Sequence, residues 1–501
     1  MKKLALLFVI LFSISCSKNE DTLEFIVINV NDIYEIDALG GGKVGGLARV
    51  AALYDSIKKE NENTLLVHAG DFLNPSLLGT LKDENGERYK GKQMVEVMNT
   101  IGFDLVAFGN HEFDLKYKDF QNRLNESNFQ WIATNIKLKT GDKLEPFYIE
   151  KNGTKTPIPK TVTFNFKDAD GTELSVGFIS STINSTPTDY VDYGDLYQDP
   201  INANKALQSK VDLVLGLTHL TIAQDKMLAN SMPNIPIIFG GHEHTNMMVP
   251  VGDAVISKAD ANARTAYVHK ITFNKSTKKT TIQSELVSLD ESVTPSKKVT
   301  RIVQRWNVLL DNKLKLILDN PYKVVFKAEV PLDGRDTETR SIQTNLGQLI
   351  AASMSANFNY EVDCAFVNGG SIRIDDELIG DITGVDIFRV LPFGGGINKV
   401  DMTGKLLEKT LNYGRLKAGT GAYLQRDNID YNAETKTWEV VGEPIKLDKI
   451  YTVALTDYLL LGFDIPFLKA DSEGMLKVYE NRPGDAAIDI RKVVINYLET
   501  L

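Results

Sequence analysis

Six side chains able to bind a metal ion follow five short apolar runs of the sequence. The runs and the residues that follow them are 25–30 with Asp32, 64–69 with Asp71, 103–108 with Asn110, 211–217 with His219, and 235–239 with His242 and His244. Runs of this length and composition predict buried strands. Because α/β proteins bind ligands at the carboxyl ends of their strands, we expect these six side chains to meet at one edge.

The mixture of donor types indicates which ions such an edge would hold. Carboxylate, amide and imidazole ligands together suit borderline divalent ions, whereas calcium prefers oxygen ligands alone and structural zinc favours cysteine. A single histidine usually lies on the surface or in a core, but four of the six histidines fall at these strand ends, including His111 beside Asn110. We therefore predict a metal centre, and we interpret His68 and His269 as structural residues.

The elements that must position these residues form two halves. Up to about Gly241, short apolar runs alternate with helical patterns, which is typical of an α/β fold. Residues 46–58 predict a helix, and residues 164–178, with Asp170-Gly171 at the centre, predict a β-hairpin over that core. A second α/β unit begins near residue 322, with a helix predicted at 347–357 and a strand at 361–367.

Residues 294–320 lie between the two halves and predict a helix. Pro295 suits a first helical turn, and apolar side chains recur at helical spacing: Val299, Ile302, Val303, Trp306, Leu309 and Leu310. This position favours an interdomain helix over an ordinary surface helix. A chain of 501 residues also exceeds one ordinary domain. We therefore expect a catalytic domain at 17–293, a linker helix at 294–321 and a smaller α/β domain at 322–501.

Residues 1–16 have the pattern of an export signal. Lys2 and Lys3 precede the apolar run 4–14, which is too short to span a bilayer as a mature helix. The segment resembles a bacterial lipoprotein signal, which implies a lipid on Cys16 and a protein exported to a periplasmic face or cell surface. An ordinary cleaved signal peptide is the alternative. Cys364 is the other cysteine, so the mature lipoprotein could form no intramolecular disulfide.

The motifs at the strand ends resemble those of the calcineurin-like metallophosphoesterases. The matching segments are Gly70-Asp71, Gly109-Asn110-His111-Glu112, His219 and Gly241-His242-Glu243-His244. With its second half, the chain resembles the 5′-nucleotidase family, which includes UDP-sugar hydrolases and cyclic-nucleotide phosphodiesterases. The resemblance covers nearly the whole mature chain. It implies a β-sandwich flanked by helices in four layers (α/β/β/α), then a linker helix and a smaller α/β substrate-binding domain.

The same resemblance implies two metal ions, divalent species such as zinc or manganese. The ligands would be Asp71 as the bridge, with Asn110, His219 and His242 on one side and Asp32 and His244 on the other. His111 and Asp114 would form a catalytic pair rather than bind metal. Two cations suit a phosphate ester because they neutralise its anionic oxygens and activate water for in-line attack.

One position departs from the family's first motif, Asp-x-His. The sequence here is Asp32-Ile33-Tyr34, so the expected histidine ligand is missing. Tyr34 can be a substitution that leaves a weaker or water-completed site, or a phenolate ligand to ferric iron as in the related purple acid phosphatases. Alternatively, Glu35 or Asp37 can compensate. We favour the substitution, because a tyrosine with a pKa of about 10 binds divalent metal poorly at neutral pH.

The second half carries motifs that resemble the 5′-nucleotidase substrate domain. Asn368-Gly369-Gly370-Ser371-Ile372-Arg373 is a glycine-rich turn followed by a guanidinium that suits a phosphate or carboxylate. The segment 345–347, with Arg340 upstream, and the segment 391–394 match two further motifs. The resemblance assigns Arg340 and Arg373 to phosphate or ribose contacts, Asn368 to the substrate, Phe393 and Tyr458 to base stacking, and Asp464 to the ribose.

We therefore predict a metal-dependent phosphoester hydrolase that releases phosphate and nucleoside from nucleotides. A UDP-sugar hydrolase or a 2′,3′-cyclic-nucleotide phosphodiesterase is an alternative, as are a thiosulfohydrolase-like enzyme and a non-catalytic surface binding protein. The arginine and aromatic pairs favour a nucleotide over a sulfur compound, and the complete motifs argue against a non-catalytic protein. A net charge of −10 argues against a nucleic-acid partner.

Overall fold

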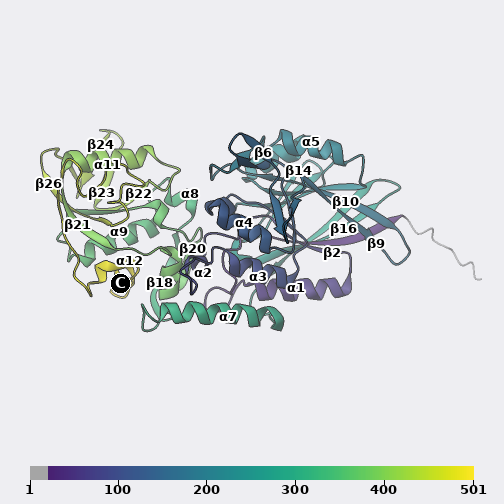
Figure 1. The fold of residues 1–501 in the computed structure, drawn as a ribbon, viewed down its shortest axis with the longest axis horizontal. Helices are drawn as coiled ribbons and strands as arrows, with labels where there is room; N and C mark the ends of the chain where they lie inside the picture. The colour runs from purple at the N-terminus through teal and green to yellow at the C-terminus, as the bar shows by residue number, and fades with distance from the viewer. Residues whose placement is uncertain (1–20) are drawn as a thin grey trace, which may run out of the picture.

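The computed structural model describes residues 21–501, which form two α/β bodies side by side (Figure 1). The predicted lipoprotein signal and Cys16 lie outside the described residues. Within the described part, no helix is both long and apolar enough to cross a membrane.

The N-terminal half (residues 21–288) contains two six-stranded sheets. The first has the order β17 (Lys279–Ser288), β16 (Thr265–Asn274), β1 (Thr22–Val30), β2 (Thr64–His68), β3 (Leu105–Ala107) and β4 (Gln130–Ile132). The second has the order β14 (Met247–Val251), β15 (Ala254–Lys258), β13 (Ile237–Gly241), β12 (Leu213–His219), β10 (Glu173–Thr182) and β9 (Thr161–Lys167). The five strands predicted to end at ligands are therefore divided between two sheets.

The two sheets pack face to face because their strands are apolar on both sides. In β1, Phe25 and Val27 enter the core between the sheets, while Ile26 and Ile28 enter the core beneath the outer helices. The outer helices of the first sheet are α1 (Leu47–Glu60), α3 (Lys92–Ile101) and α4 (Tyr117–Glu126), and those of the second are α5 (Gln198–Leu207) and α6 (Ile222–Ser231). The four-layer α/β/β/α arrangement predicted from the sequence is confirmed.

The predicted hairpin forms but has a different place. Strands β9 and β10 pair in antiparallel register around Asp170-Gly171. β10 also pairs in parallel with β12, so the hairpin is the edge of the second sheet rather than a layer over the core. The helix predicted at 46–58 is α1.

The C-terminal half (residues 324–501) is built on a smaller, five-stranded sheet. Its order is β22 (Leu424–Asp427), β19 (Cys364–Asn368), β26 (Ile450–Thr456), β21 (Ile397–Thr403) and β27 (Met475–Val478). Ala365 and Val367 of β19 face the core that includes α9 (Asn345–Asn357) and α12 (Ile490–Leu498). Cys364 and Phe366 face the opposite core, which includes α11 (Gly404–Leu416). Cys364 is thus a buried packing residue.

A helix along one side of both halves joins them (Figure 1). It is α7 (Lys297–Leu314), shorter than the predicted 294–320, and Ser296 is its N-cap. Val299, Val303 and Trp306 are buried on its inner face, and the core they join contains side chains of both halves. The helix therefore helps to fix one half against the other.

Candidate active site

The predicted ligands converge where the two sheets meet, and not at one edge of a single sheet. The first sheet supplies Asp32 after β1, Asp71 after β2 and Asn110 after β3, and the second supplies His219 at the end of β12 and His242 and His244 after β13. β1 and β2 are parallel, as are β12 and β13, so their carboxyl ends point to the same region.

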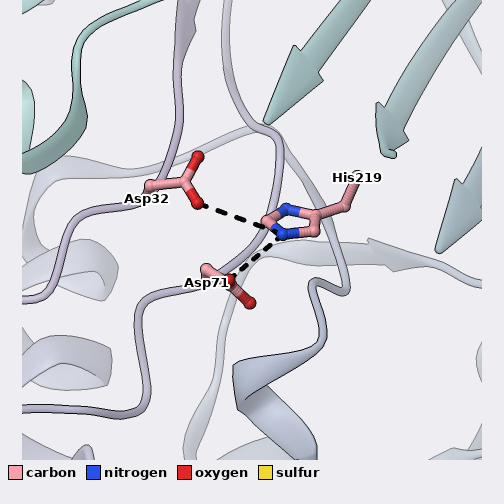
Figure 2. A group of neighbouring side chains, drawn as sticks. All are labelled: Asp32, Asp71 and His219. Atoms are coloured by element: carbon pink, nitrogen blue, oxygen red, sulfur yellow. Dashed lines mark ion pairs between the residues drawn. The ribbon is translucent and has the colours of Figure 1, made fainter. Parts of the chain in front are cut away.

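Asp32, Asp71 and His219 form the centre of this group (Figure 2). One ligand atom from each lies within 4.8 Å of the others, and all three residues are buried. His219 Nε2 is 3.1 Å from Asp71 Oδ2 and 4.0 Å from Asp32 Oδ1. Asp32 Oδ1 makes no hydrogen bond within the described chain. Buried polar atoms are normally hydrogen-bonded, so two buried carboxylates with such an atom fit a bound cation.

The backbone at three of the predicted ligands is left-handed. Asp32 has a φ of 51°, Asp71 a φ of 63° and His242 a φ of 82°. This conformation is unfavourable for residues other than glycine and is concentrated at functional sites, where the surrounding structure holds it. Gly109 contributes to that surrounding structure, because a Cβ there would lie 2.1 Å from Asp71 Oδ1.

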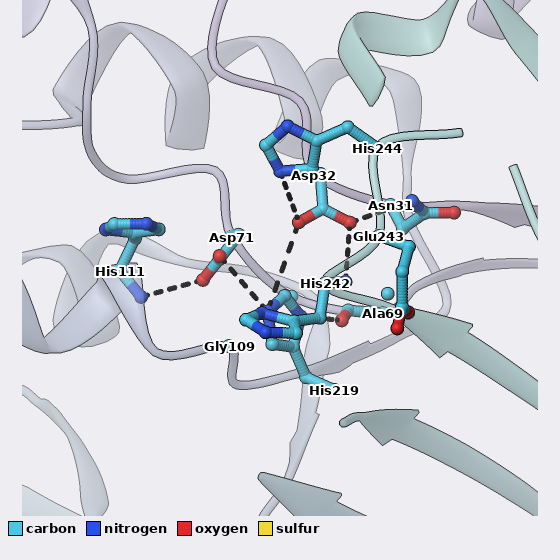
Figure 3. A network of polar contacts seen from close by, with 12 residues as sticks. Asn31, Asp32, Ala69, Asp71, Gly109, His111, His219, His242, Glu243 and His244 are labelled. Carbon is cyan, nitrogen blue, oxygen red and sulfur yellow. Dashed lines mark hydrogen bonds and ion pairs between the residues drawn. The ribbon is translucent and has the colours of Figure 1, made fainter. Parts of the chain in front are cut away.

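His242 and His244 lie beside this centre (Figure 3). The backbone N–H of His242 donates to Asp32 Oδ2 over 3.0 Å, and its ring lies 5.4 Å from the ring of His219. His244 Nε2 is 3.4 Å from Asp32 Oδ1. Asn110 is 5% exposed, and its Oδ1 has no hydrogen-bond partner among the described residues. The donor set present therefore fits divalent metal.

His111 and Asp114 form the predicted pair. Both belong to the short 3-10 helix η1 (His111–Asp114), and His111 Nδ1 is 2.9 Å from Asp114 Oδ2. Burial would lower the pKa of His111, but the charges of Asp114 and Asp71 raise it well above its usual value. Burial would raise the pKa of Asp114, yet the charges of Arg373 and His111 hold it below its usual range. These opposite shifts favour an ion pair between the two side chains.

Glu112 is a residue of this region to which the sequence assigned no role. Its carboxylate accepts the backbone N–H groups of Asp71 (2.9 Å), Phe72 (2.8 Å), Leu73 (3.2 Å) and Gly109 (2.7 Å). Burial, followed by the charge of Asp71, raises the pKa of Glu112 to about 7. Glu112 thus ties the loop after β2 to the loop after β3. Its place in the Gly-Asn-His-Glu motif was the available signal.

Tyr34 occupies the position of the missing histidine and is buried. Its hydroxyl is 3.4 Å from Asp71 Oδ2 and 3.3 Å from His244 Nε2. Burial and the charge of Asp71 raise the pKa of Tyr34 well above its usual value. Glu35 pairs with Arg389 over 3.4 Å, and Asp37 accepts from Ala38 and Asn307. The prediction that Glu35 or Asp37 compensates at this position is therefore wrong.

A carboxylate of the C-terminal half lies at this position instead. Asp375 Oδ2 is 3.1 Å from the Tyr34 hydroxyl, 3.3 Å from His244 Nε2 and 3.5 Å from His111 Nε2. The sequence did not predict this contact. The available signal was only that Asp375 follows Arg373 by two residues.

Four of the predicted substrate residues line a cavity of about 540 Å³ in the C-terminal half: Asn368, Phe393, Tyr458 and Asp464. Phe393 and Tyr458 both line it and are 53% and 38% exposed. Asp464 also lines it and accepts hydrogen bonds from Asn368 Nδ2 (2.7 Å) and the Tyr458 hydroxyl (3.1 Å). Two half-exposed aromatic rings with polar groups between them are suited to a flat, polar ligand.

One predicted arginine of the C-terminal half contacts the His111–Asp114 pair, and the second shares a carboxylate with the first. Arg373 contacts Asp114 Oδ2 over 2.6 Å, so it links the turn after β19 to the His111–Asp114 pair. Arg340 contacts Asp336 Oδ1 over 2.8 Å, and Arg373 lies 3.9 Å from the same oxygen. Arg373 therefore joins the turn after β19, part of which lines the cavity, to the His111–Asp114 pair of the other half.

Comparisons with known proteins agree with this arrangement. A family model for calcineurin-like phosphoesterases matches residues 26–246, and a model for the 5′-nucleotidase C-terminal domain matches residues 323–470. The 5′-nucleotidase of Rattus norvegicus is 27% identical over 84% of this chain and 78% of its own length. A trifunctional nucleotide phosphoesterase of Bacillus subtilis is 27% identical over 83% of this chain and 31% of its own length.

Solved structures share the fold at lower sequence identity. A 5′-nucleotidase precursor from Thermus thermophilus has a TM-score of 0.67 and 21% identity, covering 95% of this chain and 96% of its own. A sulfate thiohydrolase from the same organism has a TM-score of 0.62 and 15% identity, covering 95% and 94%. With both family models and the buried metal-binding cluster, the chain belongs to the 5′-nucleotidase family of calcineurin-like metallophosphoesterases, phosphoester hydrolases that use a dinuclear metal site.

Proposed function

We propose that this protein hydrolyses nucleoside 5′-monophosphates or close relatives, releasing phosphate and a nucleoside. The observation that carries the proposal is a contact between the two halves. Arg373 joins the His111–Asp114 pair beside the metal cluster to the turn that leads to the aromatic cavity. A substrate with an anionic phosphate at one end and a flat base at the other matches this distribution of charge and aromatic surface.

We propose that Asp71, Asn110, His219 and His242 hold one divalent ion, and that Asp32, Asp71 and His244 contribute to a second. Ions such as zinc or manganese would neutralise the phosphate ester and activate water for attack. The absorbance spectrum of the purified protein tests the alternative in which Tyr34 binds ferric iron as a phenolate. A visible charge-transfer band would support iron, whereas a colourless active protein without iron would exclude it.

In this proposal, His111 acts on the leaving oxygen. Asp114 would hold the ring through Nδ1 and favour its protonated form, and Nε2, which lies 3.5 Å from Asp375 Oδ2, would donate a proton to the departing nucleoside. Arg373 and Arg340 would bind phosphate oxygens or the ribose side, and Asn368 would orient the substrate. Phe393 and Tyr458 would stack on the base, which typically contributes about 1–3 kcal/mol per base. Asp464 would accept from the ribose.

A panel of phosphate-release assays tests the proposal. Nucleoside monophosphates, sugar nucleotides, 2′,3′-cyclic nucleotides, an aryl phosphate and a thiosulfate ester would be compared with and without added divalent metal. We expect the nucleoside monophosphates to have the highest kcat/KM, and Asn110→Ala to lose the activity. Preference for a sugar nucleotide would identify the UDP-sugar hydrolase alternative, and preference for a cyclic nucleotide would identify the phosphodiesterase alternative. Turnover of the sulfur compound alone would identify the sulfur-hydrolase alternative, and absence of turnover would favour a binding protein.

We further propose the domain division 17–293, 294–321 and 322–501, with α7 as the linker. We also propose that residues 1–16 direct export and that Cys16 carries a lipid. Growth with a labelled fatty acid would test the anchor, because label in the wild-type protein should disappear in Cys16→Ser. Equal labelling of the two proteins would exclude it.

A further inference from the structure

The two sides of the proposed metal centre differ in the number of donors that the N-terminal half provides. Asp71, Asn110, His219 and His242 serve one side. Asp32, Asp71 and His244 serve the other, where Tyr34 replaces the family's histidine. The Tyr34 hydroxyl lies 3.4 Å from Asp71 Oδ2 and 3.3 Å from His244 Nε2, so it occupies the place of that histidine among these donors. The second side is therefore one donor short.

Asp375 reaches this side from the C-terminal half. Its Oδ1 accepts the backbone N–H of Asp336 over 2.7 Å at the start of α8 (Asp336–Thr339). That hydrogen bond leaves Oδ2 beside His244 Nε2 (3.3 Å) and the Tyr34 hydroxyl (3.1 Å). Asp375 is 8% exposed and has a φ of 46°, in the left-handed region that Asp32 and Asp71 also occupy.

The neighbouring residue fixes this segment across the two halves. Asp376 binds both terminal nitrogens of Arg264, at 3.0 and 2.7 Å, and accepts from Asn262 Nδ2 over 3.1 Å. Arg264 and Asn262 belong to the N-terminal half, beside the start of β16. The contact between Asp375 and the metal centre is thus supported by an independent ion pair at the next residue.

The nearly buried carboxylates at the centre would also be stabilised by a cation near Asp375. Asp32, Asp71 and Asp375 are three nearly buried carboxylates, and in the described chain their ion-pair partners within 4.0 Å are histidines. Buried carboxylates are strongly unfavourable unless positive charge compensates them. Asp32 Oδ1 has no hydrogen bond, so a cation would satisfy an atom that the described chain does not.

We propose that Asp375 completes the second side of the metal centre, replacing from the C-terminal half the histidine ligand that Tyr34 has displaced. This inference rests on the metal centre of the proposed function. Divalent metal at that side then requires both halves to be together, and the bound metal stabilises their arrangement in return. The other side, whose donors all come from the N-terminal half, has no such dependence.

Metal content measures this proposal without reference to activity. The full-length protein is loaded with manganese, freed of excess metal and assayed for bound ions per chain, and the affinity of each ion is obtained by competition with a chelator. We expect wild type to hold two ions. Asp375→Asn should hold one, or bind the second at least tenfold more weakly. Asp381→Asn, the same charge change at an exposed residue nearby, should behave as wild type.

The decisive variant combines two substitutions. If Asp375 replaces a histidine ligand, then Tyr34→His restores a ligand to the same side, and Tyr34→His with Asp375→Asn should recover the second ion. A double variant that stays at one ion overturns the proposal, because the lost group was then not a ligand. Equal binding by Asp375→Asn and wild type overturns it as well. Tighter metal binding by Asp375→Asn would also overturn the proposal, because the carboxylate would then compete with the metal for the site rather than bind it.

A further variant keeps the test valid if Asp375→Asn does not fold. Arg264→Ala removes the ion pair that fixes the segment without altering a proposed ligand, and it should weaken the second ion several-fold. Unchanged affinity contradicts the proposal. Wild type holding a single ion contradicts it too, yet leaves phosphate release possible. Loss of all metal binding and all phosphate release would instead reject the proposed function.

Discussion

On one side of the metal centre, Asp71, Asn110, His219 and His242 all follow strands of the N-terminal half. On the other side, Asp32 and His244 stand beside a buried tyrosine and a carboxylate from the C-terminal half. The first group is complete once the two sheets pack, since each residue is fixed by the strand before it. The second depends on how two domains sit together. Metal affinity and domain arrangement should therefore be independent on one side and coupled on the other.

Removal of the residue common to both sides should have the largest effect. Asp71→Ala deletes the carboxylate nearest His219, so both ions should be lost. We expect kcat for a nucleoside monophosphate to fall on the order of 1,000-fold or more, beyond the usual cost of one transition-state contact. Asp381→Asn serves as the control, and circular dichroism checks the fold. Activity within tenfold of wild type would refute a shared ligand.

The next largest effect should follow loss of the proton donor. His111→Ala should lower kcat for a nucleoside monophosphate by about 100- to 10,000-fold, the usual range for general acid catalysis. An aryl phosphate has a better leaving group and should lose much less. Bound metal should stay at the wild-type number, because His111 is not a proposed ligand. The same loss on both substrates would argue against proton donation.

A smaller effect is expected from substitutions in the cavity, because its residues are not proposed metal ligands. Phe393→Ala should raise KM for a nucleoside monophosphate by about 5- to 150-fold, the equivalent of one stacking contact. KM for a small aryl phosphate should change little, and kcat should be nearly constant for both. Tyr458→Ala should behave in the same way. If the two substrates lose equally, the aromatic pair does not hold a base.

The smallest effect concerns a histidine outside the centre. Burial lowers the pKa of His269 to about 3 from 6.5, and its ring lies between Ser257 and Ser284. The folded protein thus holds it neutral, whereas the unfolded chain protonates it below pH 6.5. Its stabilising contribution is complete above that pH and is lost as the pH falls towards 3. In this pH window, each such histidine makes the free energy of unfolding rise by about 1.4 kcal/mol per pH unit.

His269→Gln should therefore reduce the dependence of unfolding free energy on pH between 6 and 4 by about that slope. Urea unfolding at several pH values measures it. An unchanged dependence would mean that His269 is not buried in the neutral form. His68, whose pKa burial also lowers to about 3, accounts for a similar share in both proteins.

The sequence predicts the ligand candidates that follow strands of the N-terminal half, but it does not predict that Asp375 lies beside Tyr34 and His244. One physical reason explains both outcomes. Strand ends are local features, so the apolar runs before Asp71 and His219 place both residues without knowledge of the rest of the fold. Asp375 is placed by its contact with Asp336 and by the ion pair of Asp376 with Arg264, which depends on the orientation of the two domains. No periodicity within a single element encodes that orientation.

Other differences have similar causes. The strand pattern alone placed the ligands at one edge, and only the resemblance implied two sheets. In the structure both faces of β1 are buried, with Phe25 in one core and Ile26 in the other. The sequence did not predict that Glu112 links the loops after β2 and β3, because its partners are backbone N–H groups, which carry no signal in the sequence. The aromatic cavity was predicted through resemblance alone, since Phe393 and Tyr458 have no distinctive spacing.

Phosphate release from a nucleoside 5′-monophosphate, followed during metal removal and return, tests the central claim most directly. The protein is treated with a chelator, assayed, and assayed again after addition of manganese or zinc, beside Asn110→Ala. We expect phosphate release to disappear with the metal, to return with it, and to stay absent in Asn110→Ala. Release that is unaffected by the chelator and by Asn110→Ala, or no release from any phosphate ester with metal present, would contradict it.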